Sequence, residues 1–87
     1  MTCYNVTLKT SAEKALFKLD KVTTAKIITL LQQLKQEPRP HGCKKLTGSN
    51  NAYRIRTGDY RIIYSIFDDL LVVDVIKIGH RKAVYQH

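Results

Sequence analysis

The start of the chain changes from an alternating to a helical pattern of apolar residues. Residues 4–8 alternate apolar and polar side chains, which is typical of a half-buried strand. Thr10 and Glu13 are spaced as in a capping box, where Thr10 accepts from a helical amide and Glu13 reaches back. We therefore expect a strand over residues 4–8 and a short helix from about Thr10 through Leu19.

A second helix is predicted between Asp20 and the prolines at 38 and 40. Asp20 can cap its start, and the expected helical span is about Val22 to Gln36. Its apolar residues recur at the 3.6-residue period that places them on one face: Ile27, Ile28, Leu31 and Leu34. Pro38 cannot continue a helix, and two short helices with few residues between them indicate a helical hairpin.

From Lys44 onward the pattern is that of strands separated by short polar turns. Apolar runs bounded by Gly, Asn and Asp are typical of antiparallel strands. The expected strands begin near 45–46 and continue as 52–57, 60–67 and 70–78. The last run is apolar almost throughout, so we expect it in the middle of the sheet. The order β-α-α-β-β-β predicts an α+β fold with an N-terminal strand and a helical hairpin packed on a mainly antiparallel sheet.

Length and composition limit what this chain can be. Its 87 residues predict one domain over 1–87, since two cores would leave each half too small. Apolar residues make up 44%, too many for a disordered chain. No apolar run approaches the roughly 20 residues of a membrane span. Two cysteines, Cys3 and Cys43, do not form a disulfide framework, and we expect a cytoplasmic protein with no membrane association.

The charge balance is the most informative part of the composition. Fifteen lysines and arginines against seven acidic residues give a net charge of +8, which predicts a polyanionic partner. Lysines near the helices fit an ordinary solvated face. Four of the five arginines instead lie in the half of the chain predicted to form the sheet: Arg54, Arg56, Arg61 and Arg81.

Three of these arginines are expected to converge on the sheet. Arg54 and Arg56 project from one face of their strand, and Arg61 begins the strand that a tight turn joins to it. Guanidinium groups that share a surface repel one another unless an anion lies between them, and they bind phosphate oxygens by forked hydrogen bonds. The alternative is salt bridging to Asp59, Asp68, Asp69 and Asp74. The fixed spacing of strand residues favours the phosphate site.

The sequence offers few groups for a conventional active site. It has no Gly-rich phosphate loop, no clustered acids for a catalytic metal and no evident arrangement of Ser, His and Asp. We expect no cofactor and no metal. A metal-free phosphoryl transfer fits these residues, because RNA supplies its own 2′-OH nucleophile and cations can stabilise the charge that the phosphate gains.

Three motifs in the second half of the chain read YRIR at 53–56, GDYRIIY at 58–64 and IGHRKAVY at 78–85. Together they resemble the motifs of RelE-type toxins, the ribosome-dependent mRNA endonucleases of toxin–antitoxin modules. The preceding strand and helical hairpin match the family's order, so the resemblance covers essentially the whole chain. It implies a RelE-like fold and an enzyme that cleaves mRNA in the ribosomal A site, leaving a 2′,3′-cyclic phosphate and a 5′-OH.

The resemblance also implies roles for individual residues. Arg61 would stabilise the scissile phosphate in the transition state. Arg81 would assist the leaving 5′ oxygen, and Tyr85 would stack on a substrate base. Arg56 completes the predicted catalytic group as an electrostatic clamp.

The residue that acts as general base in this chain is a separate question. Members of the family often carry lysine where this chain has Arg54 and Arg56, and arginine is a poor proton acceptor. His80 and Tyr85 are therefore the candidate general bases. Further RNA contacts are expected from Lys44, Lys45, Arg54, His80 and Lys82.

The resemblance implies partners and leaves two alternatives open. The expected partners are mRNA on the ribosome and a cognate antitoxin, whose disordered segment folds around the toxin to give a higher hetero-oligomer. A ParE-type toxin, which shares the fold and poisons DNA gyrase, is the first alternative; the paired strand arginines and Tyr85 argue against it. A non-catalytic basic module that binds RNA or an acidic protein is the second.

Overall fold

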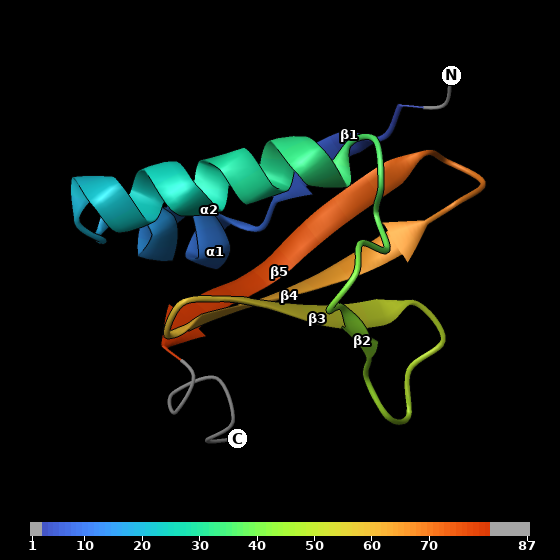
Figure 1. The fold of residues 1–87 in the computed structure, drawn as a ribbon. Helices are drawn as coiled ribbons and strands as arrows, with labels where there is room; N and C mark the ends of the chain where they lie inside the picture. Colours follow the sequence, from blue (N-terminus) through green and yellow to red (C-terminus); the bar gives the residue numbers. More distant parts are fainter. Residues whose placement is uncertain (1–2, 81–87) are drawn as a thin grey trace.

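The computed structural model describes residues 3–80, which form two helices and five strands (Figure 1). The helices are α1 (Thr10–Phe17) and α2 (Lys21–Leu34). The strands are β1 (Asn5–Leu8), β2 (Lys44–Lys45), β3 (Ala52–Thr57), β4 (Tyr60–Phe67) and β5 (Val72–His80). The predicted α+β class and the order of helices and strands are confirmed. No helix within the described residues is long and apolar enough to cross a membrane.

The strands form one sheet in the order β1-β5-β4-β3-β2. β1 runs parallel to β5, and the other neighbouring strands are antiparallel. β5 has a strand on each side and therefore lies inside the sheet, as its apolar sequence predicts. Gly58 has a φ of 59° in the tight turn between β3 and β4, a conformation that glycine adopts without strain. β2 pairs only with Tyr53 and Arg54, so the end of β3 at Arg56 and Thr57 extends past it.

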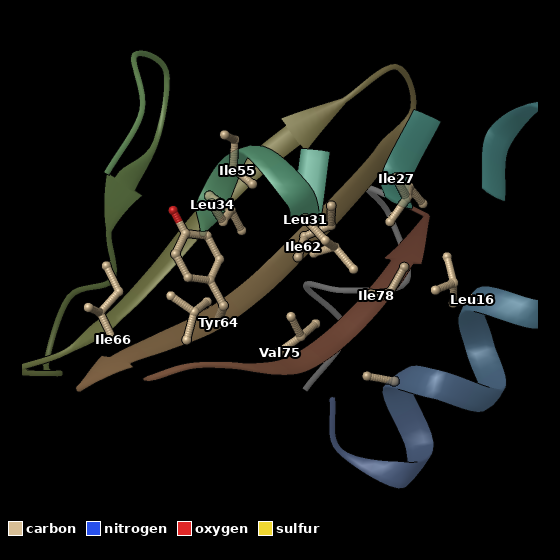
Figure 2. Packing of buried hydrophobic residues seen from close by; sticks show 12 residues of the cluster. Leu16, Ile27, Leu31, Leu34, Ile55, Ile62, Tyr64, Ile66, Val75 and Ile78 are labelled. Carbon is tan, nitrogen blue, oxygen red and sulfur yellow. The ribbon is translucent and has the colours of Figure 1, made fainter. Parts of the chain in front are cut away.

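Both helices lie on the same face of the sheet (Figure 1). Side chains from the helices and from alternate strand positions form the core between these layers. In Figure 2, Leu31 and Leu34 of α2 point toward the residues of β3 and β4. The core consists of Ala12, Leu16, Ile27, Leu31, Leu34, Ile55, Ile62, Tyr64, Ile66, Val73, Val75 and Ile78. The strand residues between these positions project to the face that the helices do not cover.

The two helices start differently. Asp20 caps α2 as predicted, and its side chain accepts a hydrogen bond from the Thr23 N–H at 3.1 Å. The predicted capping box of α1 is wrong, because the N-cap is Lys9, Thr10 is already helical, and the N-cap makes no side-chain hydrogen bond. Lys9 is still tied to the sheet, since its N–H donates to the Val75 carbonyl at 2.9 Å. The extended strand therefore leads directly into the helix.

Several element boundaries also differ from the prediction, including the end of β5 at His80 instead of 78. Both helices end two residues earlier than expected. After α2, the carbonyl of Lys35 accepts a hydrogen bond from the N–H of Tyr4 at 2.7 Å, which ties this turn to the segment before β1. β5 starts at 72 instead of 70, because residues 70–71 belong to the turn from β4, where Leu71 has a φ of 53°.

Candidate nucleic-acid interface

Strand register brings four cations together on the face of the sheet opposite the helices. Lys44 pairs with Arg54 between β2 and β3, and Arg56 pairs with Arg61 between β3 and β4. Paired residues on antiparallel strands project to the same face, and these positions alternate with core residues such as Ile55. The predicted convergence of the strand arginines is therefore present in the structure, with Lys44 beside them.

These side chains line a cavity of about 320 Å³, which we call the basic pocket. Its lining residues are Gly42, Lys44, Arg54, Arg56 and Arg61. Lys44 and Arg56 are exposed, Arg54 and Arg61 are half-buried, and the Nε atom of Arg61 is buried. Among the described residues no acidic side chain lines this cavity. Like charges at such separations repel, and an anion between them relieves the repulsion, so the pocket is suited to a phosphate group.

Two aspartates that could have neutralised the arginines make other contacts. Asp74 accepts a hydrogen bond from Thr7 Oγ1 at 2.9 Å and pairs with Lys9 Nζ at 3.1 Å. Asp68 forms a two-pronged pair with Arg39, with N···O distances of 3.1 and 2.7 Å. Both carboxylates thus have cationic partners outside the basic pocket, which weakens the alternative of salt bridging across the sheet.

The loop between α2 and β2 is attached to the core at Tyr64. The hydroxyl of this fully buried tyrosine donates to the Pro38 carbonyl at 2.9 Å. Burial raises the pKa of Tyr64 well above its usual range, and the neighbouring Cys43 adds to the shift, so the hydroxyl keeps the proton that it donates. Gly42, with a φ of 96°, then turns the chain into β2.

Arg39 makes a second attachment of the same loop. Its Nε donates to the Tyr53 hydroxyl at 3.0 Å, and its guanidinium carbon lies 5.2 Å from the centroid of that ring. The Tyr4 hydroxyl donates to the same Asp68 carboxylate at 2.7 Å. Arg39 and, to a smaller extent, Tyr4 hold the pKa of Asp68 below its usual range. The loop that leads into the basic pocket is thereby fixed to β3 and to the β4–β5 turn.

An irregularity in β5 that the sequence analysis did not predict changes the strand pairing of Lys77. β4 and β5 change register after Ile63, which pairs with Lys77, while the next residue pairs with Val75. Strict alternation from buried Val75 would turn Lys77 toward the core. Because Ile76 is an extra residue in β5, Lys77 instead pairs with Ile63, which in turn pairs with Arg54. The spacing of core residues on β5 changes from two to three here, which is the signal that the sequence carries.

Other predicted site residues lie elsewhere. Lys45 pairs with Tyr53 and so projects from the face opposite the basic pocket. His80 pairs with Tyr60, and their rings meet edge-on with centroids 5.8 Å apart. Arg61 pairs with Gly79, the residue before His80. Because neighbouring strand residues project to opposite faces, His80 lies on the face of the sheet that Arg61 does not occupy. The predicted residues outside the described part of the chain are Arg81, Lys82 and Tyr85.

The chain matches known proteins over most of its length. A family model described as the ParE toxin of the type II toxin–antitoxin system parDE matches residues 6–85. The RelE1 protein of Methanocaldococcus jannaschii is 30% identical over 87 residues, and the match covers 97% of each chain.

Solved structures share the fold at similar levels of identity. A chain in the RelE–RelB complex of Pyrococcus horikoshii OT3 is 34% identical, with a TM-score of 0.82 and coverage of 93% of this chain and 97% of that one. A chain in the intact Escherichia coli RelBE toxin–antitoxin complex is 28% identical, with a TM-score of 0.79 and coverage of 88% and 95%. This chain is therefore similar to these proteins in both fold and amino-acid sequence.

Proposed function

This chain belongs to the RelE-type toxins of the RelE/ParE superfamily of type II toxin–antitoxin systems, and we propose that it is an endoribonuclease that cuts mRNA in the ribosomal A site. The observation that carries the proposal is the basic pocket, where three guanidinium groups and an ammonium group surround one cavity. Guanidinium groups bind phosphate oxygens through forked hydrogen bonds, so the pocket suits the backbone of an RNA strand.

The proposed reaction uses the 2′-OH of the RNA as nucleophile and requires no metal. The 2′ oxygen attacks the adjacent phosphorus, and the bond from phosphorus to the 5′ oxygen breaks. The products are a 2′,3′-cyclic phosphate and a 5′-OH. One proton leaves the 2′-OH and one reaches the 5′ oxygen, so the reaction is proton-neutral. Negative charge grows on the phosphate oxygens in the transition state, and cations fixed in advance stabilise that charge.

Arg61 is the residue that we assign to this stabilisation. It is half-buried, and electrostatic interactions strengthen as groups are withdrawn from water. Arg56 lies opposite it on β3 and acts as a second clamp, while Gly79 on β5 adds no side chain over it. Arg54 and Lys44 form the next row of cations and hold the adjoining RNA backbone.

Proton transfer needs a group that the basic pocket does not supply. Arginine stays protonated at any physiological pH, and His80 lies beside Tyr60 on the other side of the sheet. This arrangement favours Tyr85 over His80 as the residue that moves the proton. We assign Arg81 to the leaving 5′ oxygen and Lys82 to a backbone contact, as the family resemblance implies.

We infer that a cognate antitoxin is the protein partner. The similar chains of Pyrococcus horikoshii and Escherichia coli come from RelE–RelB and RelBE complexes. In this chain an apolar groove of about 230 Å³ lies between β1 and the helices, and Phe17 on its rim is 67% exposed. An antitoxin segment that folds on binding would bury this groove and cover the cations, in a complex that is a hetero-oligomer.

Inhibition of DNA gyrase is the second candidate function. The observation in its favour is that the family model which matches residues 6–85 is described as a ParE toxin. The basic pocket favours the nuclease, because three guanidinium groups and an ammonium group around one cavity suit the phosphates of an RNA strand.

The test is mRNA cleavage on translating ribosomes, mapped by primer extension, alongside a gyrase supercoiling assay. Lys44 and Lys45 provide a matched pair, because they are adjacent and project from opposite faces. We expect cuts in the A-site codon, weaker cutting by Lys44→Ala and parent-like cutting by Lys45→Ala. Inhibition of gyrase without mRNA cleavage would assign the chain to the second candidate. Activity in neither assay would leave a non-catalytic basic module.

A further inference from the structure

A second cavity, with a mixed polar and apolar lining, lies beyond the edge of β3, on the side of α2. Its volume is about 420 Å³, and we call it the α2 groove. Its lining residues are Ala25, Lys26, Thr29, Leu30, Gln33, Arg56 and Thr57. β2 pairs with only two residues of β3, so at Arg56 and Thr57 the edge of β3 away from β4 faces α2 with no strand on that side in the described part of the chain.

The α2 groove and the basic pocket share one residue, Arg56. The two cavities lie on different sides of the sheet edge, and the exposed Arg56 side chain borders both. A strand of linked phosphates that occupies the basic pocket can therefore continue past Arg56 into the α2 groove, where Lys26 provides the next positive charge.

The lining of the α2 groove fits a nucleotide better than an apolar peptide. Lys26 supplies a positive charge, and Thr29, Thr57 and Gln33 supply uncharged hydrogen-bonding groups. Leu30 and Ala25 provide apolar surface that a base or a ribose can cover. Helix α2 contains two lysines and no acidic residue, so its own sequence places no negative charge against a phosphate.

We propose that the α2 groove is an RNA subsite that binds a nucleotide flanking the cleaved bond, with Lys26 contacting its phosphate. The RNA strand passes from the basic pocket around the open end of β3, with Arg56 between the two phosphates. This inference rests on the proposed function, because it takes the ligand of the basic pocket to be RNA. It adds a contact surface on α2, a helix that contributes no residue to the basic pocket.

The test uses the full chain and RNA oligonucleotides that carry a 2′-deoxy nucleotide at the scissile position, so that they bind without being cut. A short RNA spans only the cleaved bond, and longer RNAs extend it by two nucleotides on the 5′ or the 3′ side. Affinity is measured by fluorescence anisotropy across a salt series. The variant is Lys26→Gln, and the matched control is Lys21→Gln, the other lysine of α2, which does not line the groove.

We expect one of the extensions to raise the affinity of the parent about fivefold, the gain of one phosphate contact with a cation. Lys26→Gln should abolish this gain and leave binding of the short RNA unchanged. It should also lower the salt slope for the extended RNA by about 0.7, the value for one phosphate of a single strand. Lys21→Gln should keep the gain.

Three results would overturn the proposal: a gain that survives in Lys26→Gln, equal affinity of the parent for all the RNAs, or no binding of extended RNA at low salt. Cleavage on ribosomes by Arg61→Ala is measured in parallel, and it reports on the proposed function separately. If Arg61→Ala abolishes cleavage while the extensions add nothing, the nuclease assignment stands and the subsite does not exist.

Discussion

Replacement of Tyr64 by phenylalanine tests how the core holds the loop that leads into the basic pocket. Tyr64 is fully buried, and its hydroxyl donates to the Pro38 carbonyl at 2.9 Å. Tyr64→Phe keeps the ring, which stacks on Tyr53 with centroids 6.1 Å apart, and removes only the donor. Pro38 is itself buried, so water cannot readily replace the lost partner of its carbonyl.

The expected loss combines two effects. A neutral hydrogen bond contributes about 0.5–1.5 kcal/mol net, and an acceptor left unsatisfied in the interior costs about 1–3 kcal/mol. Because the loop around Pro38 can relax, we expect the free energy of unfolding to fall by about 1–2 kcal/mol. For a domain of this size, that corresponds to a decrease in Tm of roughly 5–15 °C.

The assay is urea unfolding of the parent and of two variants. Tyr53→Phe is the matched control, because its hydroxyl accepts from Arg39 in a bond near solvent, and we expect less than about 0.5 kcal/mol for it. Equal losses in Tyr64→Phe and Tyr53→Phe would refute the reasoning. So would a change in Tyr64→Phe below about 0.3 kcal/mol, because the buried bond would then contribute nothing.

The same variant has a predicted pH dependence. The pKa of Tyr64 is raised in the folded chain, so its contribution to stability is complete below the unfolded value of about 10 and decreases as pH rises toward the folded pKa. Above about pH 10, the parent should therefore lose stability more steeply than Tyr64→Phe. Unfolding curves at pH 9 and 11 measure the difference, and parallel losses would contradict it.

Three further predictions concern the site and its partner. Arg61→Ala and Arg81→Ala should each lower mRNA cleavage by about 10²–10³-fold with unchanged circular dichroism; near-parent rates would make the assignment wrong. Tyr85→Phe, which lacks the hydroxyl that we assign to proton transfer, should lower cleavage severely, and Tyr85→Ala should be worse still by the stacking contribution of about 1–3 kcal/mol; parent-like cleavage by Tyr85→Phe would contradict the proton-transfer assignment. The product of the neighbouring gene should bind this chain tightly and faster at low salt in stopped-flow measurements, and a neighbour that does not bind would contradict the antitoxin assignment.

Much of the fold could be predicted because its signals are local. The 3.6-residue period and the Asp20 cap specify α2, and the Gly58 turn with alternating residues specifies the β3–β4 hairpin. The hairpin also determines the site, because its register places Arg56 opposite Arg61. The spacing therefore predicts that Arg61 lies near Arg56, and the observed register adds that both project from the same face.

The errors arise where tertiary contacts override local patterns. Threonine is a common N-cap residue, which predicts that Thr10 caps α1. The hydrogen bond from Lys9 to β5 instead makes the extended Lys9 the N-cap, and Thr10 is the first helical residue. Lys45 and His80 occur within basic motifs, yet strand alternation turns both away from the basic pocket. Arg39 binds Asp68, 29 residues along the chain, and a contact at that separation has no local signal.

The central claim is that the arginine-lined face supports attack by the 2′-OH of mRNA on its own phosphate. The most direct test is a defined mRNA on the ribosome with one 2′-deoxy nucleotide on the 5′ side of the bond that the chain cuts. We predict that this bond is no longer cleaved, while the all-RNA control gives a 5′ fragment ending in a 2′,3′-cyclic phosphate and a 3′ fragment starting with a 5′-OH. Cleavage of the 2′-deoxy bond at the control rate would contradict the account.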